Sequence, residues 1–377
     1  MKFNKNKLVL LTSLALSSQA FAVTLYQNDT TKVDMSGAFL MDYWQPVTFF
    51  EDHDFNTSRS TLGFGVEHQF GNGWSGDVKF EWDNLTSAPT EGVSGSGDQF
   101  RTRLGYFSVH HEEYGSLRFG KQYSAYHDVA GYMDNLIVFD PDATPIFSDT
   151  KDGGFMGTAR GDDLVTYRNS FENLNISAQY GFEENSPGSL TAPTSDELAR
   201  TSNYAFAVSY DFDFGLSLGA THLVNKVETT DTGLNLEPSD EQKLTTIAAK
   251  YSYEAFKVTA AYTDGTKAHE TDYLGFGFNS DDPRNPLKSN EYADATGMDI
   301  YAEYYFSIGL RPYVYLSNVD FDDGDIQGER SIYSMGLSYH AAPNFIISGE
   351  VRKVEEENLG LGDQDDTISG ITVIYAF

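Results

Sequence analysis

The 377-residue chain has no cysteine, so no disulfide can hold it together. It is also short of basic residues: 25 Lys and Arg stand against 56 Asp and Glu, for a formal charge of −31. This charge argues against nucleic acid as a partner, because the phosphates would be repelled. It favours cations, although most of the acids are expected simply to face solvent.

Long hydrophobic runs are missing too. The one strongly apolar stretch, 8–16, is far shorter than the roughly 20 residues that a membrane-spanning helix needs. Three lysines precede it, and Ala20-Phe21-Ala22 follows it. A positive flank, a short apolar core and an A-x-A site are typical of a secretory signal peptide. We therefore predict a signal peptide at 1–22, cleaved after Ala22, and a mature domain at 23–377.

Sequence motifs of catalysis are absent as well. There is no Gly-x-Ser-x-Gly, no His-Glu-x-x-His and no phosphate loop, and none of the eight histidines lies beside a nucleophile motif. The acidic run 320–325 is similar to a calcium loop, but its twelfth position is Ser331 instead of glutamate. We expect no enzyme, no cofactor and no metal site.

What the chain has in abundance is alternation of apolar and polar residues. Met298, Ile300 and Ala302 share one face of a strand whose other face carries Asp299 and Tyr301. Similar segments of about ten residues recur throughout the chain. Their two faces cancel in hydropathy, which explains a mean of only −0.41.

The connectors between these segments alternate between short and long. Short links, such as 71–73, 113–115 and 254–256, alternate along the chain with long acidic ones, such as 226–241 and 321–329. In a closed antiparallel barrel this order places every long loop at one end and every short turn at the other. A soluble β-sandwich would also alternate, but it would not predict this asymmetry.

Sixteen strands are predicted in this way. They lie near residues 32–44, 58–70, 74–83, 99–111, 116–123, 159–168, 174–183, 202–212, 216–225, 242–253, 257–264, 296–306, 310–320, 330–341, 345–353 and 367–377. An even number lets the two ends of the sheet meet, and sixteen strands leave an aqueous channel. Closure also removes the unpaired sheet edges, which an exported chain without disulfides would otherwise leave exposed.

The C-terminal strand alternates up to Phe377, as in β-barrels of the bacterial outer membrane. The predicted fold is therefore all-β: a transmembrane 16-stranded antiparallel β-barrel in the outer membrane of a Gram-negative bacterium. We expect the barrel-assembly machinery to recognise the chain through Phe377.

Four stretches give the chain a family resemblance: 32–34, 102–104, 115–123 and 166–170. Together and in order, they resemble the trimeric general diffusion porins of Gram-negative outer membranes. The resemblance implies a homotrimer surrounded by outer-membrane lipid and lipopolysaccharide. It also implies a third loop, here 124–158, that folds into the barrel and narrows it.

In that family, acids on the third loop face arginines on the wall. By resemblance, Asp134 is the first loop acid, and Asp140 or Asp142 takes the place of the second, which falls on Val138.

On the wall, Arg103 and Arg160 match family arginines, and Arg101 lies on the same face as Arg103. Arg59 lies two residues before the third family position, which falls on Thr61. Opposed rows of fixed charge would set up a field across the gap and let polar solutes pass more easily than apolar ones.

The function expected is passive diffusion of ions and small hydrophilic solutes, with a preference for cations. A first alternative is a channel specific for sugars or organic acids, with an aromatic slide of Tyr301, Tyr305, Tyr313 and Tyr315. A second is an adhesin or receptor displayed through loops such as 265–295.

Overall fold

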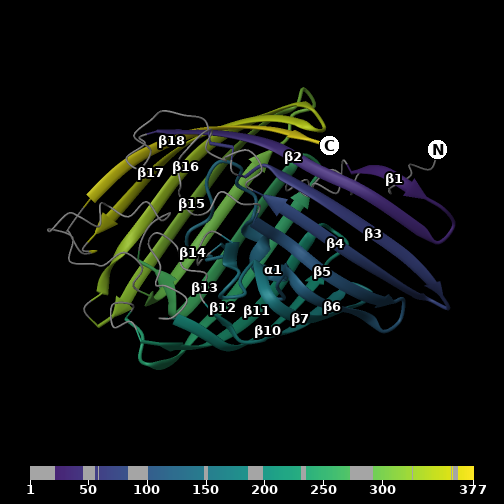
Figure 1. The fold of residues 1–377 in the computed structure, drawn as a ribbon. Helices are drawn as coiled ribbons and strands as arrows, with labels where there is room; N and C mark the ends of the chain where they lie inside the picture. The colour runs from purple at the N-terminus through teal and green to yellow at the C-terminus, as the bar shows by residue number, and fades with distance from the viewer. Residues whose placement is uncertain are drawn as a thin grey trace, which may run out of the picture.

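The computed structural model is a closed antiparallel barrel of sixteen long strands (Figure 1). It describes residues 22–45, 56–57, 59–83, 101–147, 152–185, 198–230, 235–271, 292–324, 326–357, 359 and 364–377. The predicted signal peptide, apart from Ala22, and the predicted loop 84–98 lie outside these ranges, as does most of 265–295. Within them, no helix has the length and apolar character needed to cross a membrane.

All sixteen predicted strands are present. They are β2 Thr31–Gln45, β3 Thr61–Gly71, β4 Trp74–Asp83, β5 Arg101–His111, β6 Gly115–Tyr123, β7 Arg160–Phe171, β8 Leu174–Gly181, β10 Leu198–Asp211, β11 Leu216–Thr229, β12 Ser239–Tyr253, β13 Phe256–Glu270, β14 Tyr292–Tyr304, β15 Leu310–Asp323, β16 Ile326–Ala342, β17 Phe345–Glu357 and β18 Gln364–Ala376. Each pairs with the next along the chain, and β18 pairs with β2 to close the barrel. Two short strands, β1 Val23–Gln27 and β9 Glu184–Asn185, were not predicted.

Burial along the strands is the reverse of that in a soluble protein. In β16 the apolar side chains are exposed, as for Met335 (68%) and Leu337 (50%), whereas Ser334 and Ser338 on either side of them are buried. Only a lipid environment makes such an outer face favourable, because it removes the exposed apolar surface from water.

The first and the last strands, β1 and β18, cover the same edge of β2. β18 pairs with the C-terminal half of β2, from Gln45 back to Ala38. β1 pairs with its N-terminal part, where Val23 lies opposite Met35. Between them, Phe377 and Gly37 exchange two backbone hydrogen bonds of 2.8 and 2.9 Å. A Cβ at Gly37 would lie 2.6 Å from Cζ of the Phe377 ring, so only glycine leaves room for the terminal aromatic side chain here.

At the long-loop end of the barrel, the strands extend beyond the ends predicted from the sequence. Residues 321–329 were predicted to be a long loop, and this was wrong: β15 and β16 stay paired up to Asp323 and Ile326. Likewise β11 and β12 pair as far as Glu228 and Ser239, within the predicted loop 226–241. The polar sequence here marks where the strands enter water, and backbone pairing does not depend on lipid contact.

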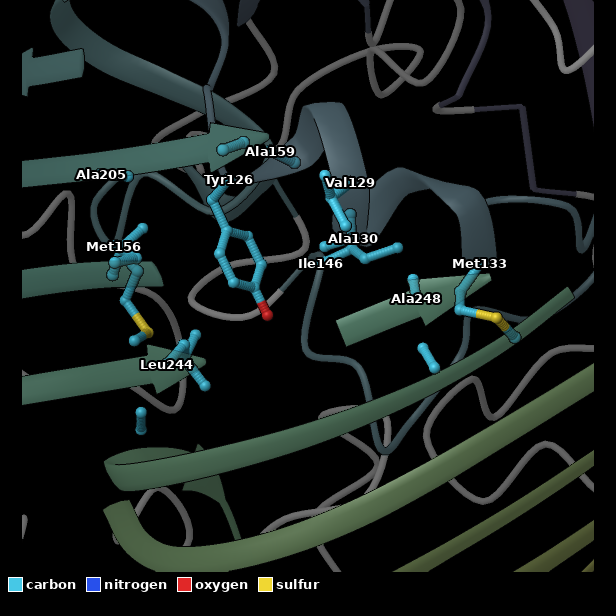
Figure 2. Packing of buried hydrophobic residues seen from close by; sticks show 14 of the residues in the cluster. Tyr126, Val129, Ala130, Met133, Ile146, Met156, Ala159, Ala205, Leu244 and Ala248 are labelled. Carbon is cyan, nitrogen blue, oxygen red and sulfur yellow. The ribbon is translucent and has the colours of Figure 1, made fainter. Parts of the chain in front are cut away.

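The third loop folds into the barrel, as predicted. After β6 it forms the short helix α1 (His127–Ala130) and the 3-10 turn η4 (Gly131–Met133). α1 contacts β10, β11 and β12, and η4 contacts β12, β13 and β14. The inner wall there carries apolar residues such as Ala205, Leu244 and Ala248, which pack against Tyr126, Val129 and Met133 of the loop (Figure 2).

Candidate pore constriction

Hydrogen bonds hold the third loop to the inner wall over much of its length. Near its start, the hydroxyls of Tyr126 and Thr246 on β12 lie 2.7 Å apart. Further on, Arg311 on β15 donates to the carbonyl of Asn135 at 3.3 Å. At the β2–β18 seam, Arg59 donates to the carbonyl of Ile137 at 3.2 Å. The loop therefore extends along the wall from β12 to the seam that closes the barrel.

Arg352 on β17 is a further anchor of the loop. Its side chain is fully buried, and Nη1 donates to the carbonyl of Asp140 at 2.8 Å. Its guanidinium also lies over the rings of Phe139 and Tyr315, at 4.9 and 5.1 Å from their centroids. The opposite charge comes from Glu350, two residues earlier on the same face, at 2.9 Å.

Asp299 on β14 binds the next part of the loop. Its two carboxylate oxygens accept from the backbone N–H of Thr144 at 2.7 Å and from the hydroxyl of Tyr315 at 2.6 Å. The Tyr315 hydroxyl in turn accepts from the N–H of Asp142 at 2.7 Å. These bonds satisfy loop backbone groups that would otherwise be buried without partners.

The predicted loop acids lie in three different settings. Asp134 is 3.5 Å from Nε2 of His127, within the loop itself. Asp142 is 3.4 Å from Arg330 on β16. Asp140 meets the wall through its backbone carbonyl, as described above.

On the wall opposite the strands that the third loop packs against, β4 and β5 carry a ladder of cross-strand charge pairs. Arg101 donates to Asp83 at 2.9 Å, and Arg103 lies 2.8 Å from Glu81. These two predicted wall arginines are therefore matched with acids of the neighbouring strand and not with acids of the loop. Every second residue of each strand points inward. Glu81 and Asp83 of β4 therefore share the inner face with Arg101 and Arg103 of β5.

The remaining predicted arginines are also paired with acids. Arg59 holds Asp42 on β2 with two hydrogen bonds, of 2.8 and 2.5 Å. Arg160 at the start of β7 bonds to Asp152 of the third loop. Burial acts to raise the pKa of Asp152, but Arg160 and Lys121 together hold it below its ordinary value.

Sequence reasoning undervalued three arginines. Arg168 on β7, which was not among the predicted site residues, donates to Asp128 of the loop at 2.8 Å. Arg330 and Arg352 were not singled out at all. Their inward positions follow from the two-residue period of β16 and β17, and that was the available signal.

The aromatic slide of the sugar-channel alternative does not line open space. Tyr301, Tyr313 and Tyr315 do point inward, but they are 0%, 4% and 0% exposed because the third loop and its anchors cover them. Tyr305 lies by a short turn beside His340, with ring centroids 5.5 Å apart. Tyr301, Tyr313 and Tyr315 therefore offer no face on which a sugar could stack, and Tyr305 alone does not make a slide.

Comparison with known proteins places the chain among channels. The sequence profile of the family described as "Gram-negative porin" matches residues 10–359. The chain belongs to this family. Outer membrane protein F of Serratia marcescens is 25% identical over 387 residues, covering 98% of each chain. Outer membrane porin N of Escherichia coli is 26% identical over 321 residues, covering 81% of this chain and 77% of the relative.

Solved structures share the fold of this porin. OmpF of Salmonella typhi, solved with daunomycin, superposes with a TM-score of 0.71 at 19% identity and covers 94% of this chain and all of its own. OmpT of Vibrio cholerae gives 0.63 at 15% identity, over 93% of this chain and all of its own. The protein is an outer-membrane porin, a water-filled channel for passive diffusion of ions and small hydrophilic solutes.

Proposed function

We propose that this porin prefers cations and that its narrowest part lies between the third loop and the wall of β3 to β7. The residues assigned to this constriction are Asp134, Asp140 and Asp142 on the loop and Arg59, Arg101, Arg103 and Arg160 on the wall. The observation that carries the preference is the ladder on β4 and β5. Arg101 and Arg103 are each neutralised by an adjacent carboxylate, so they add little positive potential to a chain that is strongly acidic.

Removing the carboxylates of this ladder tests the proposal. The double variant Glu81→Gln, Asp83→Asn leaves both arginines uncompensated while keeping side-chain size. The reversal potential in a salt gradient is expected to shift toward anions. The matched variant Arg101→Gln, Arg103→Gln is expected to shift it toward cations. If neither double variant changes the reversal potential, the ladder does not set selectivity.

We also propose that the porin is a homotrimer in outer-membrane lipid and lipopolysaccharide. Large apolar side chains cover its outer face, such as Phe206 (61% exposed) and Ile247 (61%). OmpT of Vibrio cholerae, which shares the fold, was solved in a trimer form. Native mass spectrometry of the detergent-extracted protein is expected to give three copies; a single copy would contradict the trimer.

Two processing steps complete the proposal. Cleavage after Ala22 leaves Val23 as the first residue, and β1 begins at that residue. The side chain of Phe377 is proposed to be the recognition point for the assembly machinery. Intact mass of the mature protein tests the first step, and loss of membrane-inserted protein in Phe377→Ala tests the second. That the protein has no enzymatic activity stays a prediction.

A further inference from the structure

Three cationic side chains gather on the inner wall close to the short turns. Lys257 is the second residue of β13 and Arg311 is the second residue of β15. Lys250 on β12 lies opposite Thr259, near the same turn as Lys257. The 3-10 turn of the third loop packs above them on β12, β13 and β14. The cluster therefore lies between the loop and the short-turn mouth of the channel.

The charges in this cluster do not balance. Glu303 on β14 is the carboxylate that ion-pairs with two of the cations: it lies 3.3 Å from Nζ of Lys257 and forms a salt bridge with Arg311. Nη2 of Arg311 also donates hydrogen bonds to the hydroxyl of Tyr301 at 3.0 Å and to the carbonyl of Asn135 at 3.3 Å. One carboxylate thus serves two cations, and Lys250 lies beside them.

Lys250 is the cation whose N–H donors are available to a ligand. Its ammonium lies 4.6 Å from the centroid of the Tyr132 ring of the third loop. Within the described part of the chain it has no ion pair or hydrogen bond. Asp211 on β10 attracts it from beyond ion-pair distance, and that carboxylate accepts hydrogen bonds from Ser217 at 2.5 Å and from Asn175 at 2.9 Å.

The surroundings strengthen any electrostatic interaction made here. Lys257 is 8% exposed and Tyr301 is fully buried, so the inner side of the cluster is shielded from water. A charge interaction at such a boundary is several times stronger than in bulk water. Lys250 is only partly buried, which leaves one side of the cluster open to a solute.

We propose that Lys250, with Lys257 and Arg311 behind it, forms a subsite for a small oxyanion carrying two negative charges. A phosphate group and a dicarboxylate share this chemistry: each brings several acceptor oxygens and offsets the excess positive charge. Tyr132 and Asn135 of the third loop border the subsite. This inference goes beyond cation preference and does not depend on it, because the ladder of β4 and β5 is on the opposite wall.

Such a subsite would hold an anion in the lumen beneath the third loop, on the wall opposite the ladder. Bound there, the anion would obstruct the channel for as long as it stays. Because the cluster lies on the short-turn side of the loop, the anion reaches it more readily from that mouth. The subsite therefore predicts current interruptions that depend on the side from which the anion is added.

Single-channel recording with inorganic phosphate tests the subsite. The chloride current is measured in planar bilayers while phosphate is added to one chamber and then to the other. The wild type is expected to show saturable interruptions, more frequent from one side. In Lys250→Gln the phosphate concentration for half of the effect is expected to rise about tenfold, the change that loss of one nearby charge gives. Lys250→Arg is expected to restore it.

The matched control is Lys79→Gln. Lys79 is an inward lysine of β4 on the opposite wall, where it donates to Ser36 at 2.9 Å, and its loss is expected to leave the phosphate effect unchanged. A parallel series with succinate separates the two anion classes: interruptions by both define a general dianion site, and interruptions by phosphate alone define a phosphate site.

Two results would overturn the subsite. One is an absence of saturable interruptions, or interruptions that are the same in Lys250→Gln as in the wild type. The other is a Lys250→Arg channel that responds to phosphate as weakly as Lys250→Gln, because restoring the charge should restore the subsite. Reversal potentials measured on the same channels report the cation preference separately.

Discussion

Arg352 and Glu350 form an ion pair of 2.9 Å on β17, with both side chains fully buried. The pair lies beneath the third loop, and Glu350 also accepts from the hydroxyl of Tyr313 at 2.9 Å. Because Arg352 donates to the Asp140 carbonyl as well, the position of the loop depends on this pair.

Replacing Arg352 with methionine is expected to loosen the constriction. Glu350 would be left buried and without its partner, which costs about 3–5 kcal/mol. The loop would lose its bond at Asp140 and the stacking of Phe139 on the guanidinium. We expect a noisier and larger single-channel conductance, and a lower urea midpoint for unfolding of the detergent-folded barrel.

The neighbouring variant Lys353→Gln is the control for this change. Lys353 bonds to Glu355 on the exposed side of the same strand, where an ion pair contributes little to stability. A conductance change of equal size in both variants would show that Arg352 does not act on the loop specifically.

Gly37→Ala is expected to impair closure of the barrel. The added Cβ would meet the Phe377 ring at 2.6 Å and the carbonyl of Thr61 at 2.7 Å. The terminal side chain would have to move away from the seam, so less folded protein should resist heating in detergent. Band shifts of unheated and heated samples on a gel measure this fraction.

Gly349→Ala is the matched control for the seam. A Cβ at Gly349 would meet nothing closer than 3.8 Å, an ordinary contact. Equal loss of folded protein in both alanine variants would contradict the role assigned to Gly37.

Glu184 makes the stability of the protein depend on pH. Burial raises its pKa from 4.5 to about 7, and a hydrogen bond with Asp163 and the charges of Asp162 and Asp163 act in the same direction. Between these two values the folded state keeps a proton that the unfolded state releases. Stability is therefore highest below the lower value and falls as the pH rises through the upper one.

Glu184→Gln should remove this dependence. Above neutral pH the variant is expected to be more stable than the wild type by about 1 kcal/mol, after allowance for the partial exposure of the site. Near pH 4.5 the two should unfold at the same urea concentration. The exposed neighbour Glu183→Gln is the control, and a variant gain that does not vary with pH would contradict the assignment.

The strands could be predicted from sequence because each is long enough for its two-residue period to show. β16 is the clearest case: its apolar face is exposed and its serine face is buried, and both follow from alternation alone. The strand ends could not be predicted. The run 320–323 is mostly acidic because it lies in water, but the backbone pairing continues up to Asp323 and Ile326.

The site could be predicted only in part, because alternation gives the face of a residue and not its partner. It placed Arg101 and Arg103 on the wall, but the facing acids lie on β4 and not on the loop. The bond between Arg352 and Asp140 joins residues 212 positions apart, and no local pattern shows such a contact. The inward position of the third loop came from family resemblance.

The reversal potential of the purified wild-type protein in a salt gradient tests the account most directly. A planar bilayer separates two potassium chloride solutions of different concentration, and the zero-current potential is read once channels have inserted. The account predicts stepwise conductance and a reversal potential with the sign of potassium selectivity. A bilayer that stays silent, or a reversal potential with the sign of chloride selectivity, would contradict it.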